Sequence, residues 1–130
     1  MNRSIAMLSL VTVLVTVVFT TAGATRSHAE PTKLAQAIYL TTSQACGCIL
    51  DRCQASDWVV EKTFVGEKKA LLKQLDYAID RESAKEYIKK YRIPIPPALL
   101  FLDQNGNLLW RVDGELDLDL VLKKLKEFGA

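Results

Sequence analysis

The chain has 130 residues, with 17 Lys and Arg side chains against 15 Asp and Glu. Two of the basic residues, Arg3 and Arg26, lie near the N-terminus, so residues 30–130 carry 15 basic and 15 acidic side chains. This balance argues against a nucleic-acid partner, and about 100 residues are enough for one small domain but not for two.

The N-terminal stretch predicts export from the cytoplasm. An uncharged run covers residues 5–24, and small residues follow in two A-x-A-like arrangements, at 22–24 and 27–29. This pattern predicts a signal peptide over residues 1–29. The alternative is an uncleaved membrane anchor, because the uncharged run is about as long as a bilayer span. Either way, residues 30–130 are expected to be periplasmic or secreted.

Strand and helix patterns alternate from residue 33 onward. Residues 34–42 read as a buried strand, and residues 49–64 have helical spacing with Gly66 placed to end the helix. Residues 71–80 alternate as a strand would, with Leu71, Leu75, Tyr77 and Ile79 on one side. Residues 82–91 predict a short amphipathic helix.

The C-terminal third predicts a hairpin and a last helix. Residues 98–102 are an apolar strand, "DQNGN" is a turn in which Gly106 supplies the positive φ, and residues 108–112 are the return strand. Residues 116–128 form a helix whose acidic residues come early and whose lysines come late, as the helix dipole favours. The order β-α-β-α-β-β-α predicts a three-layer α/β fold with a central mixed sheet.

All three cysteines of the chain lie in "ACGCILDRC". Cys46 and Cys48 are at the junction of the first strand and helix, where free N–H groups and the helix dipole favour a thiolate. A bridge between them closes a very small ring, and Gly47 tolerates the backbone that this requires. Cys53 is about 10 Å from Cys46 along a straight helix. It is a buried core residue, a second resolving thiol or a metal ligand.

Metal binding is the alternative chemistry for this cluster. Three thiols suit Cu(I), so Cys46, Cys48 and Cys53 are its candidate ligands. They suit a structural zinc poorly, because zinc prefers four ligands and His28, the single histidine, lies in the predicted signal peptide.

The cysteines between the first strand and helix, together with "YRIPIPPALLFLDQNGN", resemble the thioredoxin-like superfamily. The resemblance implies a thiol–disulfide oxidoreductase that needs no cofactor and acts on client thiols and disulfides together with a redox partner protein. Cys46 would attack, Cys48 or Cys53 would resolve, and Pro96 and Pro97 would bind substrate beside a cis bond.

The sequence also departs from that family in two places. No tryptophan precedes Cys46, and Leu40 stands where the family has a buried acid. Trp58, farther along the predicted helix, is expected to be a packing residue.

Overall fold

The computed structural model describes residues 32–130. The predicted signal peptide or anchor, residues 1–29, lies outside them. Within the described part of the chain, no helix is both long and apolar enough to cross a membrane.

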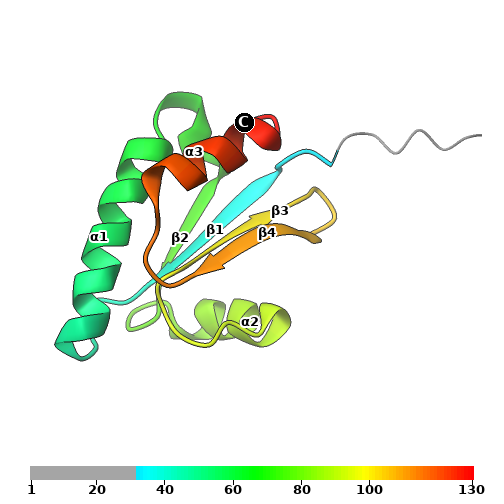
Figure 1. Ribbon diagram of the computed structural model, residues 1–130. Coiled ribbons are helices and arrows are strands. Elements are labelled where there is room, and N and C mark those ends of the chain that lie inside the picture. The colour runs from blue at the N-terminus through cyan, green and yellow to red at the C-terminus, as the bar shows by residue number, and fades with distance from the viewer. Residues whose placement is uncertain (1–31) are drawn as a thin grey trace, which may run out of the picture.

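The described residues form one four-stranded sheet with helices on both faces (Figure 1). The strands are β1 (Gln36–Thr41), β2 (Leu72–Asp76), β3 (Ala98–Leu102) and β4 (Leu108–Asp113). The helices are α1 (Gly47–Thr63), α2 (Arg81–Tyr91) and α3 (Leu118–Glu127), with a 3-10 helix, η1 (Gly66–Leu71), before β2. This order and the mixed sheet confirm the predicted fold class.

The spatial order of the strands is β2-β1-β3-β4. β1 and β2 are parallel, with Thr41 opposite Asp76 at their last residues. β1 and β3 are antiparallel, and Leu40 lies opposite Ala98. The C-terminal ends of β1 and β2 and the N-terminal end of β3 therefore meet at one end of the sheet.

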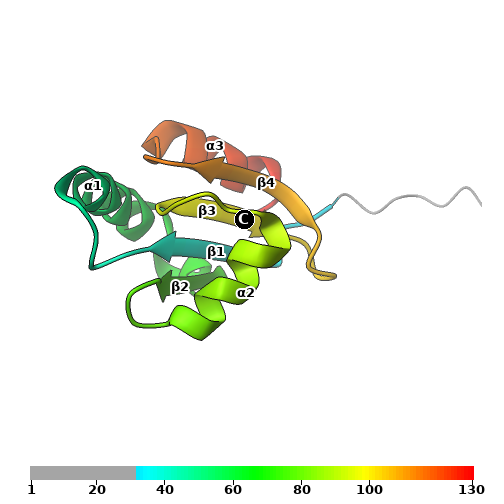
Figure 2. The same ribbon diagram turned by 90° about the horizontal axis from the view of Figure 1, so that it is seen from below.

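Each face of the sheet has its own hydrophobic core. Tyr39, Leu99 and Phe101 face α1 and α3, whereas Ile38, Leu40 and Leu100 face α2. This division follows from the alternation of side chains along each strand. Both faces of β1 and β3 are covered, which explains why their sequences are continuously apolar. Figure 2 shows α2 on one side of the sheet with α1 and α3 on the other.

One predicted strand end and one predicted helix cap are wrong. The second strand ends at Asp76 rather than at residue 80, because the chain turns there: the Asp80 N–H donates to the carbonyl of Asp76, and the Asp76 N–H donates to Oδ2 of Asp80 at 3.0 Å. Ile79 consequently lies 75% exposed instead of beside Leu75. The first helix ends at Thr63, one residue before its predicted end, but Gly66 does not cap it and instead starts η1 with a φ of 59°.

Candidate active site

The two exposed cysteines lie where the chain passes from β1 into α1. β1 ends at Thr41, residues 42–46 form a connection that is exposed from Ser43 onward, and α1 starts at Gly47. Cys46 is the N-cap residue of α1, and Cys48 is the second residue of that helix. Their Sγ atoms are 3.1 Å apart, which is hydrogen-bonding distance for two sulfurs. The structure therefore brings together the first two of the predicted site residues.

The two thiols differ in acidity. The pKa of Cys46 is lowered, first by its hydrogen bond with the Cys48 thiol and then by the nearby backbone N–H of Ile49, which itself donates to the Cys46 carbonyl. The pKa of Cys48 is raised, first because its proton is held in that hydrogen bond and then because a negative charge on Cys46 is close. Arg52 offsets only part of this rise. The shifts thus favour ionisation of Cys46 over ionisation of Cys48, with the remaining proton shared in the sulfur–sulfur hydrogen bond.

Cys53 is separate from this pair. It lies two turns into α1 and is 2% exposed, packed among the core residues, and it forms no disulfide. Among residues 32–130, no three Cys, His, Asp or Glu side chains gather closely enough to hold one metal ion. The three candidate Cu(I) ligands of the alternative interpretation therefore do not lie together in this structure, because Cys53 is apart from Cys46 and Cys48.

A buried tyrosine links β1 to α1 beneath Cys53. The Tyr39 hydroxyl donates to Oδ1 of Asp57 at 2.7 Å and lies 3.3 Å from the carbonyl oxygen of Cys53. Burial, followed by the hydrogen bond to Asp57, raises the pKa of Tyr39 far above its usual value. This pair was not found from the sequence, because its members are 18 residues apart and only the packing of α1 on β1 brings them together.

The proline loop reaches the same end of the sheet. The Pro96–Pro97 peptide bond is cis, as the resemblance implied, and Pro97 is fully buried. Ala98, the next residue, pairs with Leu40, and the Pro97 carbonyl accepts a hydrogen bond from the Gly114 N–H at 2.8 Å. Pro97 thus lies beside the end of β1 from which the cysteine connection leaves.

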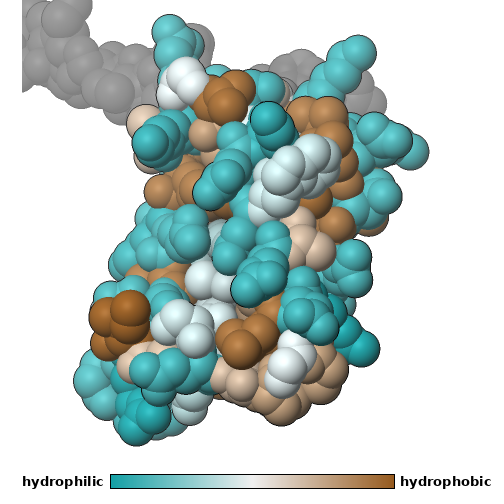
Figure 3. Space-filling view, turned by 90° about the vertical axis from the view of Figure 1, so that its left-hand side faces the viewer, coloured by the Kyte–Doolittle hydropathy of each residue, from teal (hydrophilic) through white to brown (hydrophobic). Residues whose placement is uncertain are grey.

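An apolar pocket of about 270 Å³ adjoins this loop on the α2 side. It is lined by one residue each from β1 and α2, by the residue after β2 and by the proline loop: Leu40, Ile88, Tyr77, Ile93, Pro94, Ile95 and Pro96. Figure 3 shows separate hydrophobic patches near the end of the molecule where α1 begins. Ile79 and Ile95 are among the exposed apolar residues, and Trp58 is 51% exposed, so its predicted packing role is wrong.

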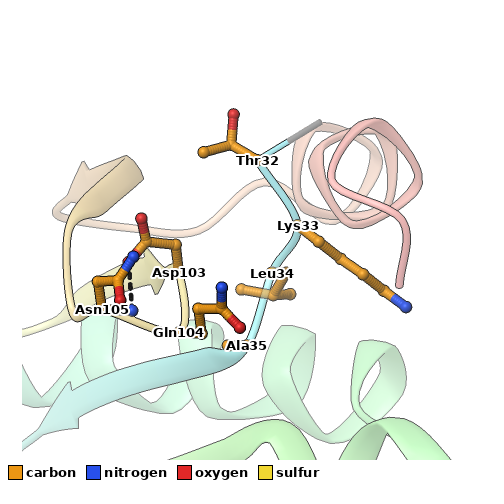
Figure 4. Close-up of a pocket in the computed structure, with 7 residues that line it drawn as sticks. All are labelled: Thr32, Lys33, Leu34, Ala35, Asp103, Gln104 and Asn105. Atoms are coloured by element: carbon orange, nitrogen blue, oxygen red, sulfur yellow. Dashed lines mark hydrogen bonds between the residues drawn. The ribbon is translucent and has the colours of Figure 1, made fainter. Parts of the chain in front are cut away.

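A second pocket, of about 320 Å³, lies at the opposite end of the sheet (Figure 4). It is lined by residues 32–35 and 103–105, and the six residues of β1 separate it from the cysteines by about 20 Å. Its carboxylate, Asp103, already accepts hydrogen bonds from Asn105 and Asn107 that hold the β3–β4 turn. The residues that line this pocket therefore include no reactive pair comparable to Cys46 and Cys48.

No protein-family model matches the chain. Among curated proteins, the chain is similar to the thiol:disulfide interchange protein DsbD of Pseudomonas fluorescens, with 27% identity over 73% of this chain and 18% of that protein. The chain therefore spans less than a fifth of that relative's length.

Solved structures with a similar fold include two thioredoxins and a DsbD domain. The thioredoxin of Aeropyrum pernix has a TM-score of 0.55 and 12% identity, covering 74% of this chain and 75% of its own. That of Malassezia sympodialis has a TM-score of 0.51 and 19% identity, covering 76% and 82%. The reduced C-terminal domain of Neisseria meningitidis DsbD has a TM-score of 0.51 and 11% identity, covering 75% and 83%. These likenesses agree with the predicted architecture, and the described part of the chain has a thioredoxin-like α/β fold.

Proposed function

We propose that this protein is an extracytoplasmic thiol–disulfide oxidoreductase acting on client proteins. The observation that carries the proposal is the exposed pair of sulfurs, 3.1 Å apart, at the start of α1. Two thiols at this separation need only a small shift to form a disulfide, and solvent exposure lets a client sulfur reach them. The similarity to a thiol:disulfide interchange protein supports the same chemistry.

Cys46 is the attacking thiol in this proposal. Its lowered pKa gives it more thiolate at neutral pH than Cys48 has, and the thiolate is the nucleophile in disulfide exchange. Cys46 attacks one sulfur of a client disulfide, forms a mixed disulfide and displaces the other client sulfur as a thiolate. Cys48 then loses its proton to solvent and attacks Sγ of Cys46. This step forms the Cys46–Cys48 bridge and releases the second client thiolate.

Over the two steps, the client disulfide gains two electrons and the protein's dithiol loses two. A redox partner protein must then return the Cys46–Cys48 bridge to the dithiol by the same exchange. Run in reverse, the steps oxidise a client dithiol, and the direction depends on the reduction potential of the pair relative to its partners. Cys48 rather than Cys53 is the resolving thiol, because Cys48 already contacts Cys46 whereas Cys53 is buried in the helix.

The client polypeptide binds beside Pro96 and Pro97 in this proposal. The register of β1 and β3 brings this loop to the end of the sheet from which the cysteine connection leaves. The adjoining pocket, lined by apolar side chains such as Ile88 and Ile95, has the volume of one or two large side chains. An extended client segment could therefore contact the loop while its cysteine faces Cys46.

Three single substitutions test the proposal, with a disulfide-bonded peptide as the client. Cys46→Ser should abolish exchange. Cys48→Ser should accumulate the mixed disulfide between Cys46 and the peptide, because no thiol remains to resolve it. Cys53→Ser should retain most of the activity and is the matched control. Loss of exchange in Cys53→Ser together with retention in Cys46→Ser would contradict the proposal.

A further inference from the structure

The connection that carries Cys46 has one side-chain anchor from another element among the hydrogen bonds of residues 32–130. We call residues 42–46 the Cys46 arm. Thr42 holds the arm internally, since its Oγ1 donates to the Gln44 carbonyl at 3.1 Å and accepts from the Gln44 N–H at 3.3 Å. The residues between Thr42 and α1 are exposed.

The external anchor is Asp76. Its Oδ1 accepts the backbone N–H of Ser43 at 3.1 Å and that of Ala78 at 2.8 Å. One carboxylate oxygen therefore ties the Cys46 arm to the turn between β2 and α2. Ser43 and Asp76 are 33 residues apart in the chain, so this is a tertiary contact and not a local turn.

Asp76 is itself held rigidly. It is the last residue of β2 and lies opposite Thr41 in the parallel register. Its N–H donates to Oδ2 of Asp80, and the Tyr77 N–H donates to the Thr41 carbonyl at 2.9 Å. The carboxylate is thus presented from a fixed turn beside the end of β1, as a support for the arm requires.

The ionised form of Asp76 is favoured in this position. Partial burial raises its pKa, but hydrogen bonds from the Ser43 side chain and from backbone N–H groups, including those of Ala78 and Ser43, together lower it below the usual value. The anchor therefore stays charged over the whole pH range in which the thiols titrate.

We propose that Asp76 is a positioning residue for Cys46. By holding Ser43, it fixes the arm so that Cys46 stays at the N-cap position of α1 and its sulfur stays against that of Cys48. The inference rests on the proposed function in assigning Cys46 as the reactive thiol. Its mechanism is purely conformational. Without the anchor, the exposed part of the arm samples other conformations, and the Cys46 sulfur spends less time within hydrogen-bonding distance of the Cys48 sulfur.

The test measures how fast iodoacetamide alkylates Cys46 in the reduced, purified protein from pH 5 to pH 10, with mass mapping of the alkylated residue. Asp76→Ala should slow alkylation at pH 7 about fivefold and move the titration midpoint upward, because thiolate-stabilising hydrogen bonds are weakened. Asp76→Asn keeps the acceptor oxygen and should stay within about twofold of the wild type. Asp76→Glu keeps the charge but displaces the oxygen by one methylene, and should be slowed as Asp76→Ala is.

Asp103→Ala is the matched control. Asp103 also accepts two backbone N–H groups in an exposed turn, but at the opposite end of the sheet. It should leave the alkylation profile of Cys46 unchanged. Urea unfolding of each variant shows whether a change in alkylation comes from lost stability or from lost positioning of Cys46. If Asp76→Ala does not fold, the alkylation profiles of Asp76→Asn and Asp76→Glu are compared instead.

Two results would overturn the inference. The first is an alkylation profile of Asp76→Ala that equals that of Asp103→Ala, which would show that Asp76 supports only the local turn. If the alanine variant does not fold, Asp76→Glu takes its place in this comparison. A slow Asp76→Asn variant would show that charge, and not the held position of Ser43, is what matters. Alkylation needs no client, so a wild-type protein that fails to exchange disulfides would contradict the proposed function and leave this test intact.

Discussion

At the scale of single residues, the sulfur pair derives its asymmetry from one helical position. Cys46 is the N-cap and Cys48 lies two residues later, so the two sulfurs are within hydrogen-bonding distance, while the Ile49 N–H next to Cys46 donates to the Cys46 carbonyl. Two chemically identical thiols thereby differ in acidity, with the pKa of Cys46 lowered and that of Cys48 raised. The spacing C-x-C places the second sulfur 3.1 Å from the first, so a small shift is enough to form a bridge.

This asymmetry predicts a pH effect. A lowered pKa means more thiolate at a given pH, so Cys46 should be alkylated before Cys48 at pH 7. Cys48→Ala removes the donor, and the midpoint of Cys46 alkylation should therefore move toward higher pH. Stopped-flow alkylation across the pH range measures this shift. A midpoint that stays in place, or falls, would show that Cys48 does not acidify Cys46.

The Tyr39–Asp57 hydrogen bond predicts a stability effect. Tyr39→Phe leaves the half-buried Asp57 carboxylate without its donor, which should cost about 1–2 kcal/mol of unfolding free energy. Tyr87→Phe is the control, since the Tyr87 hydroxyl contacts only the exposed Lys73 amine at 3.4 Å, and it should cost less than about 0.5 kcal/mol. Urea denaturation measures both. Equal losses would show that the buried bond contributes nothing beyond a surface contact.

The sequence located the cysteines on the right elements, but it did not reveal the residues that support them. Cys46 and Cys48 could be placed because a strand pattern ends and a helix pattern begins around them. Asp57 and Asp76 could not, because each acts across a strand pairing or a helix packing that local periodicity does not encode. Trp58 shows the same limit, since an aromatic residue in a helix is expected in the core and here lies half-exposed.

At the scale of elements, the hydrogen bonds of the residues at the ends of helices and strands explain which boundaries could be predicted. α3 begins close to its predicted start, and its N-cap is Asp117, whose side chain accepts the Leu120 N–H at 2.8 Å. β2 ends earlier than predicted because the hydrogen bonds between Asp76 and Asp80 close a turn, while the alternating apolar pattern continues through it to Ile79. Apolar alternation alone therefore overestimated the strand.

The cap of α3 gives a third prediction. Asp117→Ala should lower the unfolding free energy by about 1 kcal/mol, because it leaves the Leu120 N–H without a partner. Asp117→Asn should restore most of that loss, since asparagine caps about as well as aspartate. Thermal or urea unfolding of the two variants compares them. An asparagine variant as unstable as the alanine variant would mean that the charge, and not the cap bond, provides the stabilisation.

At the scale of the whole molecule, the packed part of the sheet and the candidate site occupy different places. Two hydrophobic cores hold β1 and β3 between the helices, whereas the Cys46 arm, the Asp76 turn and the proline loop all lie at one end of these strands. A fully covered β1 fixes where the arm begins, while the exposed arm leaves both sulfurs open to a client. Parallel pairing brings the C-terminal ends of β1 and β2 to this edge, and antiparallel pairing brings the start of β3 to it.

The central claim is that Cys46 and Cys48 form a reversible redox pair. The most direct test is the reduction potential of the purified protein in glutathione buffers, with mass mapping of the bridge at each potential. We expect a two-electron equilibrium at about −120 to −270 mV, the range of thiol-exchange proteins, with a Cys46–Cys48 bridge and a free Cys53. The absence of a reversible bridge, or a bridge that includes Cys53, would contradict the claim.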